Sequence, residues 1–376
     1  MKPVGPTRRK TMQKKGLNRR TVLKTGAAAA GVSLFNINHA WSQDATYDGG
    51  VFDAGGHVLN IAEWGGYWQE TQNRLLLDQF QKDFNCKIQY DSTFPWFPKF
   101  VANGPEQPPV AICNWNLPEM FKTHQAGDYF LDVEEIKANV PNTAKLWDFA
   151  MRTGIGVTWA FSRYCYAYRT DSAGGAPTGF KDFWKPEFAG RRGTYITSNT
   201  LQMMFFMASC NAFGSGETDF EAGYQAMRDA MPMKISDFTG SMAALLERGE
   251  VDIAVQSDAE ALLQKEKGVP VDLYYWDEYK GILTQTKTIS RYADPMSKKL
   301  AFALLNRTLE AEYQTAFADE FWMRPSNRDA VIPEKMAALG VVNSADATDG
   351  LHIPDWQAYI DQEIDIVETV NEIFGS

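Results

Sequence analysis

The sequence has few of the side chains that build metal centres or nucleophilic active sites. Four cysteines and four histidines are spread over 376 residues, with no C-x-x-C pair. No H-E-x-x-H, G-x-S-x-G, phosphate-binding loop or dinucleotide fingerprint occurs. We therefore predict no enzymatic activity, no cofactor and no metal site. The cysteines are expected to be buried free thiols, with one disulfide as the alternative; they are Cys86, Cys113, Cys165 and Cys210.

Basic residues are scarce outside the N-terminal segment. Residues 1–42 hold nine of the 37 lysines and arginines and no acid, which leaves 28 basic against 47 acidic residues in the rest. We do not expect this acidic remainder of the chain to bind nucleic acid or an anionic membrane, because binding to either needs basic patches on the protein surface. No run of ~20 apolar residues, the length that crosses a bilayer, follows that segment. We expect a soluble protein, long enough for two domains of ~150 residues.

The N-terminal segment has the three parts of an export signal: a basic stretch, a modest apolar run and small residues. Residues 18–24 (NRRTVLK) resemble the twin-arginine motif, with Asn18 and Val22 as departures. Residues 40–42 form a small-x-small cleavage site. The resemblance implies removal of residues 1–42, passage through the twin-arginine translocase and a periplasmic location. A basic tail or an uncleaved anchor is the alternative.

Two strand–loop–helix units carry aromatic residues where a ligand would bind. The first has a strand at 58–62, a break at Glu-Trp-Gly-Gly and a helix whose apolar face repeats every four residues: Trp68, Gln72, Leu76, Phe80 and Phe84. The second has a strand at 110–113, the loop Asn-Trp-Asn-Leu-Pro and a helix at 118–125. In an open α/β sheet, ligands bind at the carboxyl ends of the strands.

The remaining chain alternates helices with strands, which predicts an α/β fold with mostly parallel sheets. A long aromatic strand at 157–168 can run from one domain into the next. The run 201–210 is an apolar helix whose methionines and phenylalanines are expected in the core. The other expected strands are 86–90, 251–255, 269–274 and 281–290; the other expected helices are a stretch from Pro177, 242–246, 258–267, 300–321 and 356–374.

Four phrases in order resemble the extracellular solute-binding proteins of ABC importers, in the branch that includes spermidine/putrescine-binding proteins. They are AEWGGYW (62–68), PTGFKDFWKPEFAGRR (177–192), LLERGEVDIAVQSDAEA (245–261) and KKLAFALLNRTLEAEYQTAFADEFWMRPSNRDA (298–330). The resemblance implies a type II-like periplasmic binding protein that closes about a hinge on a small-molecule solute and delivers it to a membrane-embedded ABC permease. We expect a monomer.

The resemblance also implies a domain plan. Lobe one covers residues 56–160 and 281–325, and lobe two covers 161–280. Residues 43–55 are a flexible tail, and 326–376 are C-terminal helices that pack on the lobes. The segments 157–168 and 281–290 connect the lobes.

By position, the resemblance predicts eight ligand-binding residues on four loops: Trp64, Tyr67, Trp115, Asn116, Asn199, Gln202, Gln256 and Asp258. Polyamine binders typically have carboxylates where Asn199 and Gln202 stand, so we expect a polyamine-like or other amino-compound rather than a defined polyamine. Aromatic rings would then contact its cationic group. Asp258 could serve as the N-cap of its helix instead.

Two basic residues support the alternative of an anionic carboxylate or phosphonate solute. Lys287 lies on the returning strand and Arg324 in the turn Met-Arg-Pro, where a guanidinium can bind a carboxylate with two hydrogen bonds. Both could instead be solvated or bridge the lobes. Tyr164, Tyr166 and Tyr168 share one strand face, similar to ferric-ion binders, but no histidine or carboxylate completes a metal set.

Overall fold

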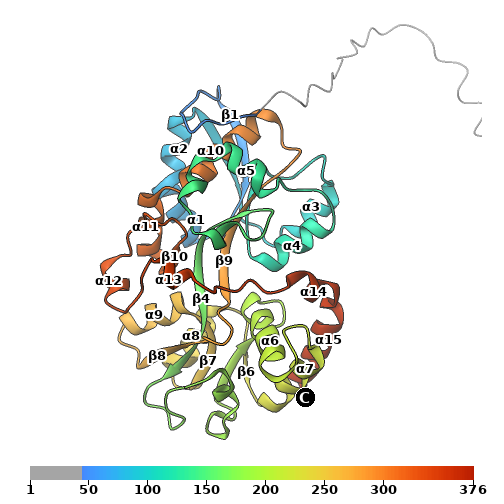
Figure 1. Ribbon diagram of the computed structural model, residues 1–376, viewed down its shortest axis with the longest axis vertical. Helices are drawn as coiled ribbons and strands as arrows, with labels where there is room; N and C mark the ends of the chain where they lie inside the picture. Colours follow the sequence, from blue (N-terminus) through green and yellow to red (C-terminus); the bar gives the residue numbers. More distant parts are fainter. Residues whose placement is uncertain (1–44) are drawn as a thin grey trace, which may run out of the picture. The chain divides into compact units, whose positions relative to one another are not determined.

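One strand of 13 residues, β4 (Val157–Arg169), belongs to both parts of the central sheet. The computed structural model describes residues 45–376 (Figure 1), so the predicted export signal lies outside the described residues. The first part of β4 pairs with β9 (Ile282–Ile289) and β10 (Arg324–Pro325), and the second with β7 (Ile253–Ser257) and β8 (Val271–Tyr275), all antiparallel. The change of partners falls between Arg163 and Tyr164.

The sheet order is β2-β1-β3-β9-β4-β7-β5-β6, with β8 and β10 also paired to β4. The first sheet half contains the parallel strands β1 (His57–Ala62), β2 (Cys86–Asp91) and β3 (Ile112–Trp115), together with β9 and β10. The second sheet half contains β7 and β8 with β5 (Arg192–Tyr195) and β6 (Lys234–Ser236), where β5, β6 and β7 run parallel. Figure 1 shows β4 and β9 running between the two halves. The predicted α/β fold is confirmed, and its sheet is mixed: four strand pairings are parallel, and the five that involve β4 or β9 are antiparallel.

The first strand–loop–helix unit forms as predicted. After β1, Gly66 adopts a φ of 63°, a conformation that costs glycine little. The helix then runs through α1 (Tyr67–Gln72), one π turn η1 (Asn73–Leu77) and α2 (Asp78–Asp83). All five residues of the predicted apolar face are buried. The burial of this face fixes the helix against the sheet and sets the direction of the loop before it.

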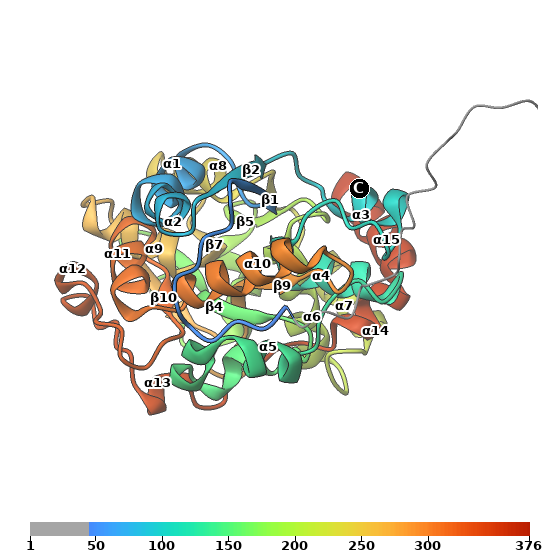
Figure 2. The ribbon, with the colours of Figure 1, turned by 90° about the horizontal axis from the view of Figure 1, so that it is seen from above.

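Helices cover both sheet halves. In Figure 2, α10 crosses β9, and it also packs on β1. Residues 201–210 of α6 are all buried, which confirms the predicted core helix. The remaining α-helices are α3 (Phe97–Asn103), α4 (Leu117–Gln125), α5 (Val133–Asn139), α6 (Thr200–Phe213), α7 (Phe220–Ala230), α8 (Thr239–Glu247), α9 (Asp258–Glu266), α10 (Pro295–Thr308), α11 (Ala311–Phe321), α12 (Glu334–Ala337), α13 (Ala345–Thr348), α14 (Trp356–Asp361) and α15 (Glu363–Gly375). The 3₁₀ turns are η2 (Pro141–Lys145), η3 (Asp148–Met151), η4 (Phe180–Trp184) and η5 (Pro186–Phe188).

Three helix predictions were wrong. The stretch 300–321 is two helices, since α10 ends at Thr308 and α11 begins at Ala311. The side-chain amides of Gln314 and Asn327 donate hydrogen bonds to the backbone carbonyl groups of Thr308 and Leu309, which ends the first helix. The stretch 356–374 is also two helices, broken where the backbone leaves the helical region between α14 and α15. From Pro177 only the short turns η4 and η5 form, because prolines and glycines interrupt the segment.

The segment before β1 contacts the rest of the chain at Tyr47. This residue is 4% exposed and its backbone N–H donates to Asn139 Oδ1 at 3.2 Å, whereas most of residues 45–56 are exposed. The flexible tail at 43–55 stays a prediction. Residues Gln43–Ser376 form one compact unit, and the boundaries of the predicted lobes stay a prediction. In the described part of the chain, no helix combines the length and the apolar character needed to cross a bilayer.

Candidate functional site

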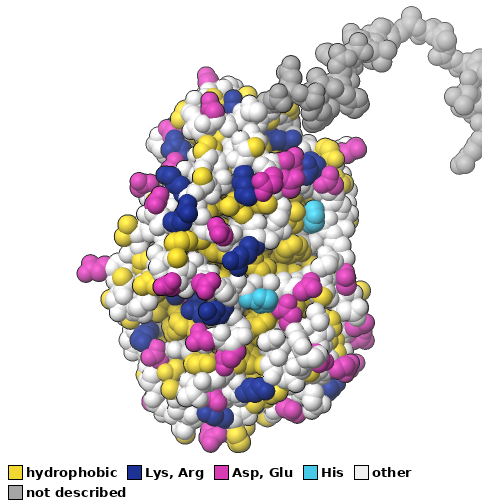
Figure 3. Space-filling view, viewed as in Figure 1, with side chains coloured by type: hydrophobic (Ala, Val, Ile, Leu, Met, Phe, Trp, Pro, Cys, Tyr) yellow, Lys and Arg dark blue, Asp and Glu magenta, His cyan; other side chains and the backbone are white. Residues whose placement is uncertain are grey.

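A cavity of about 1190 Å³ lies between the loops of the first sheet half and those of the second. Leu283 and Gln285 of β9 lie between its two walls. Figures 1 and 2 both place α3 and α4 near α14 and α15, and Figure 3 shows hydrophobic side chains in a hollow on the face of Figure 1. The lining residues are Trp64, Phe94, Pro95, Phe97, Pro98, Asn116, Pro118, Glu119, Lys122, Thr197, Ser198, Asn199, Thr200, Leu201, Met203, Asp237, Phe238, Thr239, Leu283, Gln285, Glu363, Ile364, Val367 and Glu368.

Trp64 is the main aromatic residue of the first wall, and its ring is held in place. Its indole N–H donates to Gln285 Oε1 at 2.7 Å, and Asn114 Nδ2 donates to the same oxygen at 2.6 Å. The ring also packs against Phe94 and Trp96, with centroids 5.2 and 4.8 Å away. Because β9 carries Gln285, the central sheet itself orients this tryptophan toward the cavity.

Two asparagines at helix starts line the cavity, one from each sheet half. Asn116 is the N-cap of α4, and its Oδ1 is buried without a partner among the described residues. Asn199 is the N-cap of α6 and accepts from the backbone N–H of Leu201 at 2.9 Å. Both follow a strand, as the unit strand–loop–helix requires. With Trp64, they are the predicted ligand residues that line the cavity.

Charged groups in the cavity lining are mostly carboxylates. Four acids line it with one base, Lys122, which forms an ion pair with Glu363 of α15. On α4, Glu119 Oε1 accepts from the backbone N–H groups of Trp96 and Phe97, both at 3.1 Å. Burial raises the pKa of Glu119 to about 7, although these two N–H groups and Lys122 oppose the shift. The lining favours positive over negative ligands.

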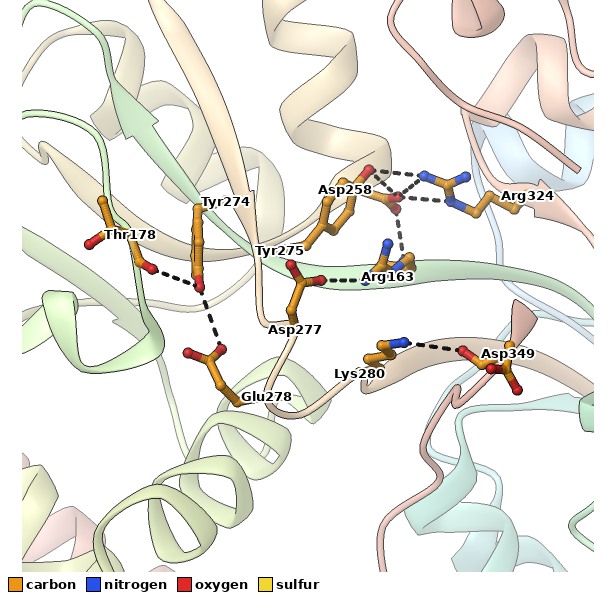
Figure 4. Close-up of polar contacts among 10 residues, drawn as sticks. All are labelled: Arg163, Thr178, Asp258, Tyr274, Tyr275, Asp277, Glu278, Lys280, Arg324 and Asp349. Carbon is orange, nitrogen blue, oxygen red and sulfur yellow. Dashed lines mark hydrogen bonds and ion pairs between the residues drawn. The ribbon is translucent and has the colours of Figure 1, made fainter. Parts of the chain in front are cut away.

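A buried ion pair joins the two sheet halves next to β4 (Figure 4). Arg324 of β10 donates from Nε and Nη2 to Asp258 Oδ2 at 3.0 and 2.9 Å, and their side chains are 8% and 1% exposed. Asp258 Oδ1 accepts from the backbone N–H of Arg163, and the Tyr275 hydroxyl lies 2.9 Å from Arg324 Nη2. Burial is the largest single influence on the pKa of Arg324 and lowers it, but Asp258 and Tyr275 together raise that pKa above its ordinary value.

Comparisons with solved structures show which proteins share this architecture. An extracellular solute-binding protein of Bordetella parapertussis matches with a TM-score of 0.69 and 19% identity, over 84% of this chain and 98% of the other. A spermidine/putrescine ABC transporter substrate-binding protein of Streptococcus pneumoniae matches with a TM-score of 0.63 and 16% identity, over 85% and 99%. This is the fold of the solute-binding proteins of ABC transporters.

Sequence comparison gives a weaker likeness in the same direction. The spermidine/putrescine-binding periplasmic protein of Escherichia coli (strain K12) is 25% identical over 146 residues. The match spans 38% of this chain and 40% of the relative, so less than half of either protein is compared. No family model matches the chain. Another solved structure with this fold is described as a GABA receptor, so ligands differ among the proteins that share it. It matches with a TM-score of 0.68 and 15% identity, over 85% of this chain and 98% of the other.

Five of the predicted ligand residues lie outside the cavity lining: four are buried in the interior, and Tyr67 is 57% exposed on the surface. Trp115 is fully buried, and its indole N–H donates to Thr288 Oγ1 at 2.8 Å. The other contacts are those of Tyr67 with Glu320, Gln202 with Thr194, Gln256 with Tyr195 at 3.0 Å, and Asp258 with Arg324. The N-cap of α9 is Ser257, so the alternative role of Asp258 as the helix cap is wrong.

The two predicted basic ligands lie outside the cavity lining as well. Lys287 is 2% exposed, forms an ion pair with Glu63 and lies 5.4 Å over the ring of Trp159. Burial lowers the pKa of Lys287, and the carboxylate of Glu63 acts against that shift. Arg324 connects the two sheet halves through its ion pair with Asp258, which agrees with the alternative expectation of a bridging charge. Neither cation is directed to a solute in this structure.

The cysteines and the strand tyrosines belong to the protein interior. All four cysteines are free and buried. Tyr164 and Tyr166 are 2% and 0% exposed and pack on Trp276, with ring centroids 5.8 and 5.1 Å away. Residues 45–376 contain no group of three or more histidine, cysteine, aspartate or glutamate side chains that could hold a metal ion.

Sequence reasoning missed five parts of the cavity wall: the loop 94–98, Glu119, α15, the loop 237–239, and Leu283 with Gln285 of β9. The run Phe94-Pro95-Trp96-Phe97-Pro98 carried a signal, since a proline-rich aromatic loop directly follows a strand. Glu119 also had one, because it lies in the first turn of a helix that follows a predicted ligand loop. The third part, α15, carried no signal in the sequence. An amphipathic pattern predicts a C-terminal helix but not the surface on which the helix packs.

Proposed function

We propose that this protein is a periplasmic receptor of an ABC importer that captures a small organic amino-compound and performs no chemistry on it. The observation that carries the proposal is the large cavity lined by loops from both sheet halves. A solute that contacts both halves at once favours the closed arrangement over the open one. The likeness in fold to solute-binding proteins supports the same function.

The charges of the lining favour an amino-compound over an anion. Lys287 and Arg324, on which the anionic alternative depends, are each neutralised by a buried carboxylate. Lys122, the basic residue of the lining, is paired with Glu363. An anion entering this cavity would meet carboxylates and no free cation among the described lining residues, at a cost in electrostatic energy.

The proposal includes the protein's path and partners. Residues 1–42 would direct export by the twin-arginine translocase and be removed, which leaves a soluble periplasmic monomer. Residues 56–160 with 281–325 would act as one lobe and 161–280 as the other, with 326–376 packed across them. The pair Lys122–Glu363 and the bond from Gln125 to Asp361 support this last point, because they join α4 to the C-terminal helices. The membrane-embedded permease would receive the loaded receptor.

A screen of amines, amino acids, polyamines, sugars, carboxylates and phosphonates by thermal shift tests the proposal. A true solute at 100 times its Kd should stabilise the protein by ~2.7 kcal/mol. The variant Trp64→Ala should bind that solute at least about tenfold more weakly, since it removes an aromatic wall worth ~0.5–2 kcal/mol in cation–π contact together with apolar area.

The matched control is Tyr292→Ala, which removes an aromatic side chain, 40% exposed, outside the cavity lining. It should bind as the unaltered protein does. If no compound of the screen stabilises the protein, the proposed function is wrong. If a solute binds and Trp64→Ala leaves its Kd unchanged, the solute lies elsewhere.

A further inference from the structure

One carboxylate in the cavity has a hydrogen-bonding capacity that the protein does not use. Glu119 Oε1 accepts from two backbone N–H groups at the start of α3, which fixes the side chain. Its Oε2 is buried and has no partner among the described residues. An unpaired buried acceptor costs roughly 1–3 kcal/mol, so a donor that reaches it gains that energy. Among the lining residues, the buried polar atoms without a partner are both acceptors: this oxygen and Asn116 Oδ1.

The rest of the lining is largely apolar, and part of it is exposed to water. Phe94, Phe238 and Ile364 are 52%, 57% and 80% exposed, and all three line the cavity. Covering the exposed apolar surface of these side chains stabilises a complex. Clustered exposed apolar side chains of this kind mark binding sites. A solute that covers them has a substantial apolar body.

Lys122 shows how this wall accommodates an ammonium group. Its Nζ pairs with Glu363 and lies 5.2 Å over the ring of Phe97. A carboxylate and an aromatic face thus hold one cation from two sides. Glu119, on the same helix, has no ion-pair partner in the structure described for residues 45–376, and Trp64, Phe94 and Phe97 line the same wall.

We infer that the cavity takes an organic monocation with a bulky apolar body, whose ammonium group donates to Glu119 Oε2 while the aromatic side chains cover the body. The inference depends on the proposed function and narrows its solute. Asp258, the carboxylate predicted to meet an ammonium group, lies outside the lining and already holds the guanidinium of Arg324, so it is not available to a second ammonium group of a polycation. Glu119 would then determine specificity for charge, and Phe94, Phe238 and Ile364 for the apolar body.

Binding of such a cation should depend on pH near neutrality. Besides burial, the groups that act on Glu119 are the backbone N–H groups of Phe97 and Trp96 and the ammonium group of Lys122 on its own helix, which pairs with Glu363 of α15. With a pKa of about 7, Glu119 is mostly protonated at pH 6 and mostly ionised at pH 8. Because an ammonium group binds the ionised form, the affinity should be about tenfold higher at pH 8 than at pH 6.

The test measures Kd by calorimetry at pH 6 and pH 8 for 2-phenylethylamine, its uncharged analogue 2-phenylethanol, the anion 3-phenylpropionate, putrescine and spermidine. The variant is Glu119→Gln, whose amide oxygen still accepts from Trp96 and Phe97. The control is Glu134→Gln, an exposed glutamate on α5. We expect 2-phenylethylamine to bind best. Glu119→Gln should weaken it at least about tenfold at pH 8 and remove the pH dependence, while Glu134→Gln changes neither.

Each other outcome contradicts the inference. It is wrong if the alcohol, the anion or a polyamine binds more tightly than 2-phenylethylamine, or if Glu119→Gln leaves the Kd of the amine unchanged. Should that variant fail to fold, the pH dependence and the comparison of amine with alcohol in the unaltered protein still decide. Another amino-compound that binds in the cavity more tightly than 2-phenylethylamine, such as a polyamine, overturns the inference and leaves the proposed function standing. If nothing in the wider screen binds, both are wrong.

Discussion

Replacing Arg324 with alanine should lower the free energy of unfolding by about 3–5 kcal/mol, the usual loss when one partner of a buried ion pair is removed. The substitution leaves the carboxylate of Asp258, 1% exposed, without its cation in the interior. The Tyr275 hydroxyl and the backbone N–H of Arg163 remain, but they do not neutralise the charge. Urea denaturation at pH 7, with the m-value checked for two-state behaviour, measures the loss.

An exposed ion pair provides the control for this variant. Lys137 pairs with Glu134 on the surface of α5, with side chains 39% and 78% exposed. Lys137→Ala should change the free energy of unfolding by no more than ~0.5 kcal/mol, because exposed pairs contribute little. A loss below 1 kcal/mol for Arg324→Ala would mean that Asp258 is solvated or protonated in the folded protein, contrary to the buried pair described above.

The variant Trp115→Ala should also lose about 3–5 kcal/mol of folding stability, because it leaves a large cavity in the interior. The ring is fully buried and packs against Trp96, Phe100 and Phe130 with centroids 5.4–5.8 Å away. Its indole N–H donates to Thr288, whose hydroxyl would lose this partner. Denaturation curves of the solute-free protein measure the effect.

Trp64→Ala is the natural comparison, since both residues were predicted as ligand contacts. Trp64 is only partly buried and lines the cavity, so its removal should affect solute binding more than folding. We expect Trp115→Ala to affect folding stability more than solute binding. If Trp115→Ala folds as stably as the unaltered protein and loses solute binding, then Trp115 contacts the solute and its buried position is not the one that matters for function.

How far the site could be predicted from the sequence depends on where each strand ends. The period of the apolar residues located β1, the helix after it and the loop that carries Trp64. The third strand was predicted to end at residue 113, but β3 extends to Trp115. Those two residues change Trp115 from a loop residue into a buried strand residue. Asn116, next in the chain, is the one that reaches the cavity.

The pairing of charges could not be predicted at all. Asp258 and Arg324 are 66 positions apart, and so nothing local in the chain indicates that each neutralises the other. The same holds for Lys287 and Glu63. Asp258, Arg324 and Lys287 were predicted as ligand contacts because of their residue types. In the folded protein each of them pairs with an opposite charge in the interior instead. The break at Leu309 also comes from tertiary contacts, because Gln314 and Asn327 bind the backbone carbonyl groups there and outweigh helix propensity.

The burial of every cysteine makes this protein suitable for a fluorescent reporter. Burial raises the pKa of Cys86 to about 11 and of Cys210 to about 12, and those of Cys113 and Cys165 well above the ordinary value. Thiol reagents attack the thiolate, so all four should stay unlabelled in the folded protein. Ile364 is 80% exposed at the edge of the cavity. A dye attached through Ile364→Cys would therefore mark one site, and its emission would follow solute occupancy without any further change to the chain.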